Sequence, residues 1–277
     1  MQSVRLIKHE ILSVGYMQGV LETYEELAAS RMSKIRKAVT EARNYYLELS
    51  IVLDEVGRDI LTAAGEKEPI DALVLLSSHT GMFGDLGSRV VARYIEEVTT
   101  HKGDAYVIGE NGAKMVRTLL PDFKFKFMDL PNEELTPAAF SEVVTQLQSY
   151  RRVKIYYGDF VNIARQEPVE RLLSGELTMD MLDKKDRLQR EKLLKFLYEP
   201  TVSEVGKHLS TKVFAKVFDE TIRQAQLGKF ASRLMHLDNS LNNLEIRQEK
   251  LHKAKRKARK LLDNKKQGLR VAAGMMI

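Results

Sequence analysis

The fold is decided by two stretches near opposite ends of the chain: SVRLIKHEILSVGYMQGVLETYEELAAS at residues 3–30 and FASRLMHLDNSLNNLEIRQEKLHKAKRKARKLL at residues 230–262. In both stretches, most residues at alternating three- and four-residue steps are apolar. Such a heptad repeat places them on one side of a long helix, where they form a seam for a partner helix. Because neither seam can stay exposed to water, we expect the two ends to pack as an antiparallel coiled coil.

The first seam continues past residue 30, and both seams contain polar residues. The seam positions are Val4, Ile7, Ile11, Val14, Gln18, Leu21, Glu25, Ala28, Met32, Ile35, Val39, Ala42, Tyr46, Leu49 and Leu53 in the first stretch, and Phe230, Leu234, Leu237, Leu241, Leu244, Gln248, Leu251, Lys255, Ala258 and Leu262 in the second. Polar residues at such positions lower stability but can fix the register. One antiparallel register places Gln18 opposite Lys255 and Glu25 opposite Gln248. The alternatives are that the helices diverge there, or that one helix extends past the other.

Between the two helices, short apolar runs alternate with helical patterns. We expect strands at residues 71–77, 105–108, 123–130 and 153–157, helices at 88–98, 112–120 and 137–148, and an edge strand or turn at 196–200. Strands that alternate with short helices predict a mainly parallel, open sheet. The expected fold class is therefore α/β: an antiparallel coiled coil of long N- and C-terminal helices with an inserted Rossmann-like open α/β domain. The expected boundaries are 1–60 for the N-terminal shaft helix, 64–200 for the α/β domain and 201–277 for the C-terminal shaft helix.

Composition excludes several classes of protein. The 277 residues contain no cysteine, so disulfide and thiol chemistry are excluded. No apolar run approaches the roughly 20 residues of a membrane span, and the charged N-terminal stretch does not resemble a secretion signal. The net charge is +6, and eleven Lys or Arg residues lie between Arg247 and Arg270 against only two acidic residues. This basic run fits a solvated helix face, a nucleic-acid-binding surface or a basic rod inside a protein cavity.

Residues that carry catalytic chemistry form no recognisable pattern. Gly81, Gly84 and Gly87 follow an expected strand and precede an expected helix, but they lack both the GK[ST] ending of a P-loop and the GxGxxG spacing of a dinucleotide site. The six histidines show no metal-binding spacing. We therefore predict no catalytic residues, no cofactor and no metal. A small α/β enzyme that uses the glycine turn, and a coiled-coil scaffold that binds nucleic acid through residues 247–270, remain as alternative hypotheses.

The layout and several motifs resemble the gamma subunit of F-type ATP synthases. The matching segments, in order along the chain, are SVRLIKHEILSV with Gln18, LAASRM at 27–32, SSHTGMFGDLG at 77–87, VIGENG at 107–112, RQEPVERLL at 165–173, YEP at 198–200, and the tail from Asp238 to Ile277. The likeness covers nearly the whole chain. The chain departs from the family where Glu22, Glu25 and Glu26 stand in a region with family lysines, and where Lys229 replaces a glutamate.

The resemblance implies a function without catalysis by this chain. It implies the central rotor shaft of an ATP synthase, which couples rotation to ATP synthesis or hydrolysis in a surrounding ring of α and β subunits. The implied further partners are the epsilon subunit and a membrane rotor ring, met by residues near 30–50 and 205–225 and by parts of the insert. The implied location is the cytoplasmic face of the cell membrane, as a peripheral subunit with no direct membrane span. The residues expected to contact partners are Arg259, Lys260, Lys255, Arg256, Arg31 and Arg233.

Overall fold

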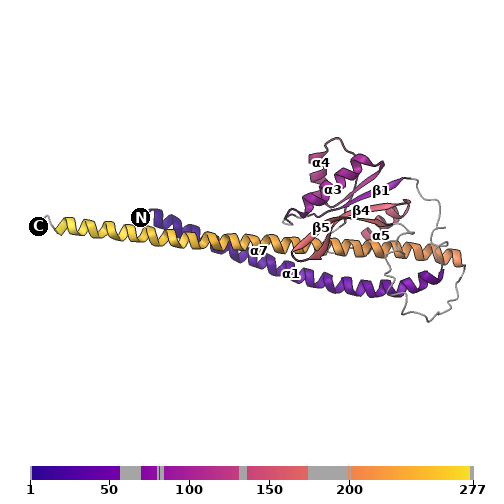
Figure 1. Ribbon diagram of the computed structural model, residues 1–277, viewed down its shortest axis with the longest axis horizontal. Helices are drawn as coiled ribbons and strands as arrows, with labels where there is room; N and C mark the ends of the chain where they lie inside the picture. Colours follow the sequence, from indigo (N-terminus) through magenta and orange to yellow (C-terminus); the bar gives the residue numbers. More distant parts are fainter. Residues whose placement is uncertain are drawn as a thin grey trace. The chain divides into compact units, whose positions relative to one another are not determined.

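A computed structural model of the chain contains two very long helices and a five-stranded sheet (Figure 1). It describes residues 2–56, 70–79, 81, 84–130, 136–173, 199 and 201–274. The helices and strands are α1 (Gln2–Val56), β1 (Asp71–Leu76), α3 (Leu86–Thr100), β2 (Gly103–Ile108), α4 (Glu110–Leu119), β3 (Lys126–Met128), α5 (Pro137–Gln148), β4 (Val153–Asn162), β5 (Arg165–Leu173) and α7 (Val202–Gly274). The fold class predicted from the sequence is confirmed. The sequence FLYEP, expected to form an edge strand or turn, lies mostly outside the described residues.

The chain divides into two compact units, and both long helices contribute to each of them. One unit contains residues 1–30 and 233–277, and we call it the coiled-coil unit. The other contains residues 31–232 and holds the whole sheet, and we call it the α/β unit. The boundary between the units therefore falls inside α1 and inside α7, so neither helix belongs to one unit alone.

In the coiled-coil unit, the heptad seams face each other as predicted. Every predicted seam residue from Val4 to Ala28 and from Leu234 to Leu262 is buried or half-buried, and most of their neighbours are exposed. Val14, Ala28 and Leu237 retain at most 3% of their surface. The helices are antiparallel, because Glu10 pairs with Arg247 at 2.6 Å while Val4, six residues earlier, lies beside Leu262. The alternation of three- and four-residue steps was therefore sufficient to identify the packed face.

The register of the coiled coil differs from the one that pairs Gln18 with Lys255. Lys255 shares a pocket with Val4 and Lys8. Gln18 lies ten residues beyond Lys8, or about 15 Å along the helix axis. Because the helices are antiparallel, Gln18 instead faces residues that precede Arg247. That register was wrong, and the alternative in which one helix extends past the other is confirmed: α7 continues beyond the N-terminus of α1 (Figure 1).

In the α/β unit, the sheet has the strand order β3-β2-β1-β4-β5. The pairs β1–β2, β1–β4 and β2–β3 are parallel, and β4–β5 is antiparallel. The chain leaves β1 toward β2 and β3 on one side and returns to add β4 on the other side. The predicted open, mainly parallel sheet is thus confirmed, with its reversal of strand order located between β1 and β4.

Both faces of the sheet are covered, and α7 itself covers one of them. Alternate residues of a strand point to opposite faces, so Ala72, Val74 and Leu76 join one hydrophobic cluster while Leu73 and Leu75 join another. The first cluster includes residues of α5 and the buried positions of α7 from Leu209 to Ala225. The second includes α3 and α4. The first thirty residues of α7 are therefore a structural layer of the α/β unit, which the heptad pattern did not predict.

Two strands differ from the sequence prediction. The phenylalanines of residues 123–130 predicted a long strand, but β3 spans three residues and Phe127 is 44% exposed. Phe125 instead lies under Arg117, whose guanidinium carbon is 5.4 Å from the ring centroid. The strand β5 was not predicted, because its sequence contains Pro168 and several charges. As an edge strand it needs no amide donor on its outer side, so a proline is tolerated.

Two glycines allow helices to approach β4 very closely, Gly228 from α7 and Gly158 toward α3. A Cβ atom on Gly228 would lie 2.4 Å from the carbonyl oxygen of Gly158 in β4. A Cβ on Gly158 would lie 2.8 Å from the side chain of Leu86 in α3. Helix α7 therefore packs backbone to backbone against β4, an approach that any larger residue at 228 would prevent.

Candidate partner-binding surface

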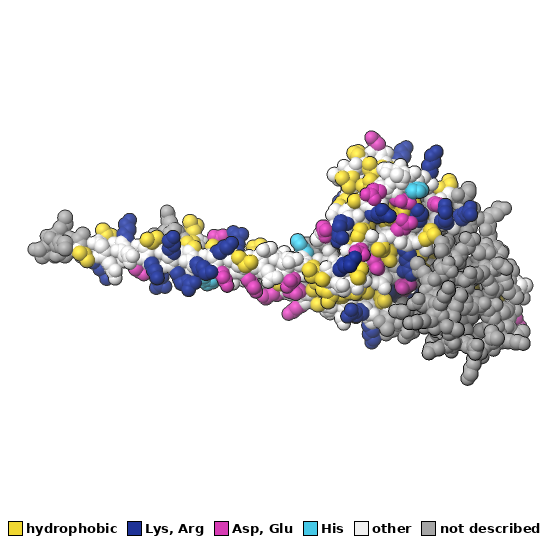
Figure 2. Space-filling view, in the orientation of Figure 1, with side chains coloured by type: hydrophobic (Ala, Val, Ile, Leu, Met, Phe, Trp, Pro, Cys, Tyr) yellow, Lys and Arg dark blue, Asp and Glu magenta, His cyan; other side chains and the backbone are white. Residues whose placement is uncertain are grey.

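The residues expected to contact partners are mostly exposed and lie on the basic part of α7. Arg256, Arg259 and Lys260 are exposed, whereas Lys255 is half-buried at its seam position. Lys255 and Arg259 are one helical turn apart and line the same pocket beside α1. Figure 2 shows basic side chains gathered along this end of the helix. The structure thus brings Lys255 and Arg259 together and leaves Arg256 and Lys260 on the outer surface.

Arg31 and Arg233 lie in different units and are not part of this group. Arg31 is exposed on α1 in the α/β unit, and Arg233 is half-buried on α7 in the coiled-coil unit. Each makes interactions within the chain.

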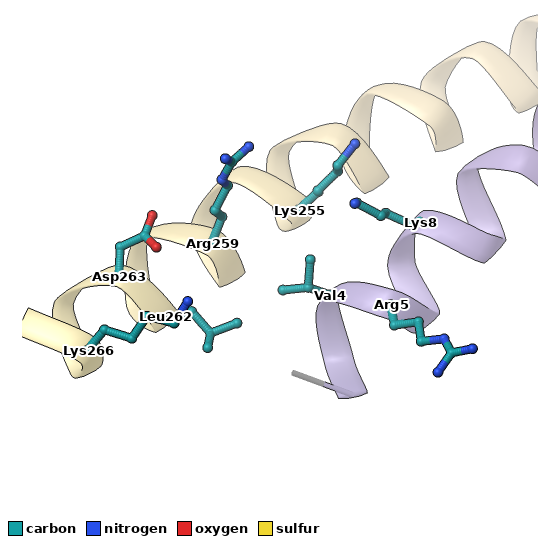
Figure 3. A pocket seen from close by; sticks show the side chains of 8 residues that line it. All are labelled: Val4, Arg5, Lys8, Lys255, Arg259, Leu262, Asp263 and Lys266. Atoms are coloured by element: carbon teal, nitrogen blue, oxygen red, sulfur yellow. The ribbon is translucent and has the colours of Figure 1, made fainter. Parts of the chain in front are cut away.

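A pocket of about 630 Å³ lies between the first turns of α1 and the late turns of α7 (Figure 3). Five cationic side chains and one carboxylate line it, together with Val4 and Leu262. The charged lining residues are Arg5, Lys8, Lys255, Arg259, Asp263 and Lys266. Figure 3 shows Lys8 and Lys255 extending toward each other across the gap between the helices.

The face of α1 that points away from α7 carries an apolar stripe. Leu12, Tyr16, Val20, Tyr24 and Leu27 follow one another at steps of four and three residues, so they share one side of the helix. Each of them is between 43% and 75% exposed. Contiguous exposed apolar surface on a soluble protein marks an interaction site. The stripe was not predicted from the sequence, because the stronger heptad pattern accounted for the helix.

Charge changes sign along the coiled-coil unit. Glu22 and Glu26 are exposed on α1, and Asp238 is exposed on the facing part of α7. Acidic side chains therefore form a band before the basic end of α7 begins, as Figure 2 shows. A partner that contacts the full length of this unit must present basic groups to the acidic band and acidic groups to the basic end.

The glycine turn after β1 is the point where open α/β sheets generally bind ligands, because the strand order reverses there. Gly84 adopts a φ of 55°, in the left-handed region that favours glycine, just before α3 begins. Helix α7 covers this region: the amino group of Lys229 donates a 2.5 Å hydrogen bond to the carbonyl oxygen of Ser77, directly after β1. Removal of that amino group from water lowers the pKa of Lys229 to about 7. In this chain the switch point is thus a contact between sheet and helix.

Two ion pairs of the α/β unit join neighbouring elements and lower the pKa of the carboxyl group in each pair. Lys126 contacts Asp104 at 2.8 Å, and this hydrogen bond lowers the pKa of the carboxyl. Lys154 contacts Glu97 at 2.6 Å, and this hydrogen bond lowers the pKa of the Glu97 carboxyl. Each pair joins a strand to an adjacent strand or helix.

Among the described residues no group of histidine, cysteine or acidic side chains is arranged to hold a metal. None of their helices has the length and apolar character of a membrane span.

The architecture defines a class of protein: a stalk of two antiparallel terminal helices with an α/β domain inserted between them. A family model for ATP synthase matches residues 3–261. The ATP synthase gamma chain of Pelotomaculum thermopropionicum is 22% identical over 260 residues, covering 88% of each chain. That of Clostridium kluyveri is 24% identical over 250 residues, covering 86% of this chain and 85% of the relative. The chain belongs to the ATP synthase gamma family.

Solved structures share the fold. A chain of the Euglena gracilis mitochondrial ATP synthase, from its OSCP/F1/c-ring structure, has a TM-score of 0.64 at 14% identity. The match covers 99% of this chain and 94% of that one. A chain from the central stalk and c-ring of the Tetrahymena thermophila mitochondrial ATP synthase has a TM-score of 0.60 at 16% identity, covering 80% and 99%. The comparisons give no support to the alternative of a nucleic-acid-binding scaffold.

Proposed function

We propose that this chain is the central rotor shaft of an F-type ATP synthase and couples rotation to ATP synthesis or hydrolysis in a surrounding ring of α and β subunits. The observation that carries the proposal is the family match over residues 3–261, which includes both shaft helices and the insert. The exposed apolar stripe on α1 supports it independently, because such a stripe needs cover. A ring that encloses the coiled-coil unit provides that cover.

The shaft acts by differential contact rather than by chemistry of its own. A rotor can shift a nucleotide site between conformations only if it contacts those conformations with different free energies. The acidic band and the basic end of the coiled-coil unit give the surface a charge that changes along its length. In this role the chain is a non-catalytic subunit without cofactor or metal, peripheral at the cytoplasmic face of the membrane. Epsilon and the membrane rotor ring meet residues near 30–50 and 205–225.

Isolation of the complex from its native source tests the assignment. The expected result is co-purification of this chain with α, β and epsilon subunits and a membrane ring, identified by mass. A soluble chain that is isolated alone or bound to nucleic acid would contradict the proposal. In a reconstituted complex, ATP hydrolysis should drive rotation of this chain relative to the ring.

The proposed ring contacts are Arg259 and Lys260, with Lys255 and Arg256 beside them and Arg31 and Arg233 as further candidates. Arg259 and Lys260 are exposed, so each can reach a carboxylate on the ring. Arginine offers a planar fork that binds carboxylates in pairs of hydrogen bonds, and lysine a mobile point charge. A pair of this kind contributes about 0–1 kcal/mol when exposed and more when the ring shields it from solvent.

Substitution of the two residues tests their role. Arg259→Ala should leave the chain folded and slow steady-state ATP turnover of the reconstituted complex, and Lys260→Ala should have a smaller effect. Lys265→Ala, at another exposed lysine of the same helix, is the matched control. Unchanged turnover in the Arg259→Ala/Lys260→Ala double variant would remove both residues from the contact surface.

A further inference from the structure

We infer that the pocket between the start of α1 and the late turns of α7 binds a compact polyphosphate, either free or as the phosphate chain of a nucleotide. The inference goes beyond the rotor role and does not require a ring. The charge of the lining supports it. Five cationic residues and one acidic residue line a pocket of about 630 Å³, so its lining has a net charge of +4.

The lining cations lack carboxylate partners within the described part of the chain. The cross-helix ion pair near this end of the coiled coil joins Glu10 to Arg247, outside the pocket. Lys8, Lys255 and Lys266 make no ion pair with a described residue. Like charges that converge on one space repel each other, and a bound anion is the simplest way to neutralise them.

The distribution of basic residues along α1 supports a site rather than a general basic surface. Residues 1–30 contain one arginine and one lysine, Arg5 and Lys8, and both line this pocket. Lys8 extends toward Lys255, which is half-buried at a seam position (Figure 3). Lys8 of α1 and Lys255 of α7 therefore place two cations at one gap, whereas a solvated face would spread its charges along a single helix.

The geometry favours a compact multivalent anion. Lysine and arginine bind phosphate through charge-assisted hydrogen bonds, and small-molecule sites in proteins have volumes of about 300–1,000 Å³. Val4 and Leu262 add an apolar surface to the same pocket. A phosphate chain matches the converging cations, and the base of a nucleotide would match the apolar surface. Extended acidic segments of a partner protein would more readily meet the outward cations Arg256 and Lys260.

Isothermal titration of the full-length chain with tripolyphosphate, and separately with ATP, tests the inference. We expect saturable binding of one ligand per chain, with an affinity that falls as salt rises from about 50 to 200 mM. Lys8→Gln/Lys255→Gln should weaken binding about tenfold or more, since two charge-assisted contacts are lost. Lys250→Gln/Lys257→Gln is the control, because it removes the same charge from exposed positions of α7 outside the pocket.

Two further variants distinguish the ligand source and guard against misfolding. Lys255→Arg keeps the charge and should keep binding if the chain is folded. Equal affinity for tripolyphosphate and ATP indicates that the site recognises the phosphate chain alone. Tighter binding of ATP, reduced selectively by Val4→Ala, indicates a nucleotide. Absence of saturable binding, equal losses in both double variants, or tighter binding of a polyglutamate peptide than of tripolyphosphate would overturn the inference.

The test is separate from that of the rotor role, since it uses the isolated chain and a binding readout. Failure to bind polyphosphate leaves assembly and ATP turnover untouched. A regulatory consequence does rest on the proposed function: Lys255 and Arg259 are also proposed ring contacts, so a bound polyphosphate would compete with the ring for them. In that case tripolyphosphate should slow assembly of the wild-type chain with the ring, and the Lys8→Gln/Lys255→Gln variant should resist this effect.

Discussion

Helix α7 packs in two different ways along its length. Between Leu209 and Ala225 it covers a face of the sheet, and Val217, Phe218 and Ala225 are at most 2% exposed. Between Leu241 and Leu262 it packs against one other helix, and its seam residues are only half-buried. A helix on a sheet buries a wide face, whereas a helix in a two-stranded coiled coil buries a narrow stripe. The first part of α7 therefore anchors the chain, and the second exposes most of its surface to partners.

The largest expected difference between the two parts comes from truncation of a buried side chain. Phe218 is fully buried and stacks on Phe140, with ring centroids 5.7 Å apart. Phe218→Ala should lower the free energy of unfolding of the α/β unit by about 3–5 kcal/mol. Leu251→Ala, on the half-buried seam, should lower the free energy of unfolding by less, because Leu251 buries less apolar surface when the chain folds. Denaturant titration followed by circular dichroism measures both. Equal losses would mean that the seam is as tightly packed as the sheet contact.

The next effect concerns the buried amino group where α7 meets β1. The pKa of Lys229 is lowered to about 7 in the folded chain, while an unfolded lysine titrates near 10.4. Between these values the unfolded state binds more protons, so the free energy of unfolding should rise with pH from about 7 to 10.4. Lys229→Met removes this dependence. It should stabilise the chain below pH 7 by up to about 4 kcal/mol, less about 1 kcal/mol for the lost hydrogen bond to Ser77.

Thermal unfolding of wild type and Lys229→Met at a series of pH values measures that difference. The advantage of the variant should shrink as pH rises and vanish near pH 10. Lys212→Met is a suitable control, because Lys212 is exposed on the same helix. A constant difference at all pH values would show that the amino group keeps its hydration in the folded chain.

Two glycine-to-alanine substitutions should change the free energy of unfolding in opposite directions. A Cβ on Gly228 would lie 2.4 Å from the carbonyl oxygen of Gly158, so Gly228→Ala should force α7 away from β4 and cost about 1–3 kcal/mol. A Cβ on Gly19 meets nothing within 4 Å, so Gly19→Ala should stabilise α1 by about 0.5–1 kcal/mol through helix propensity. Melting temperatures of the two variants decide the matter. Stabilisation by both would mean that α7 lies farther from the sheet than the structure places it.

The smallest effect is expected at the open end of the coiled coil. Lys8→Glu replaces a repulsion of Lys255 by an attraction, and it should stabilise the helix pair by about 0–1 kcal/mol. High salt should weaken this gain, since the Debye screening length between exposed charges falls to about 3 Å at 1 M ionic strength. His9→Glu adds a carboxylate at an adjacent exposed position that does not line the pocket. A gain of the same size in this control would assign the effect to net charge.

Much of the fold was predictable because it depends on local periodicity. The helix bounds of α5 were predicted to the residue, with Pro137 at its first position. The seam positions of the coiled coil were also predicted, since their spacing follows from the geometry of the helix alone. The strand β5 and the short β3 were not, because edge position and pairing partner decide them, and neither leaves a periodic signal in a single segment.

The candidate site was predictable only in part. The basic run from Arg247 to Arg270 is visible in the sequence, but its meeting with Arg5 and Lys8 depends on the register. The polar seam residues Gln18 and Lys255 suggested a different register. Polar positions constrain which residues can face each other, but the helix ends and the summed packing of the whole seam select among the registers that remain.

The sequence by itself determined the long helices, the seam along each, the α/β character of the insert and the absence of cysteine chemistry. These follow from composition and from periodicities of 3.5 and 2 residues, which are properties of single segments. Tertiary structure alone decided the register of the coiled coil, the removal of the Lys229 amino group from water at the strand reversal, and the use of α7 as a layer on the sheet. Those outcomes depend on which surfaces meet across about 150 residues of chain, and contact between distant surfaces is set by the packing of the whole molecule.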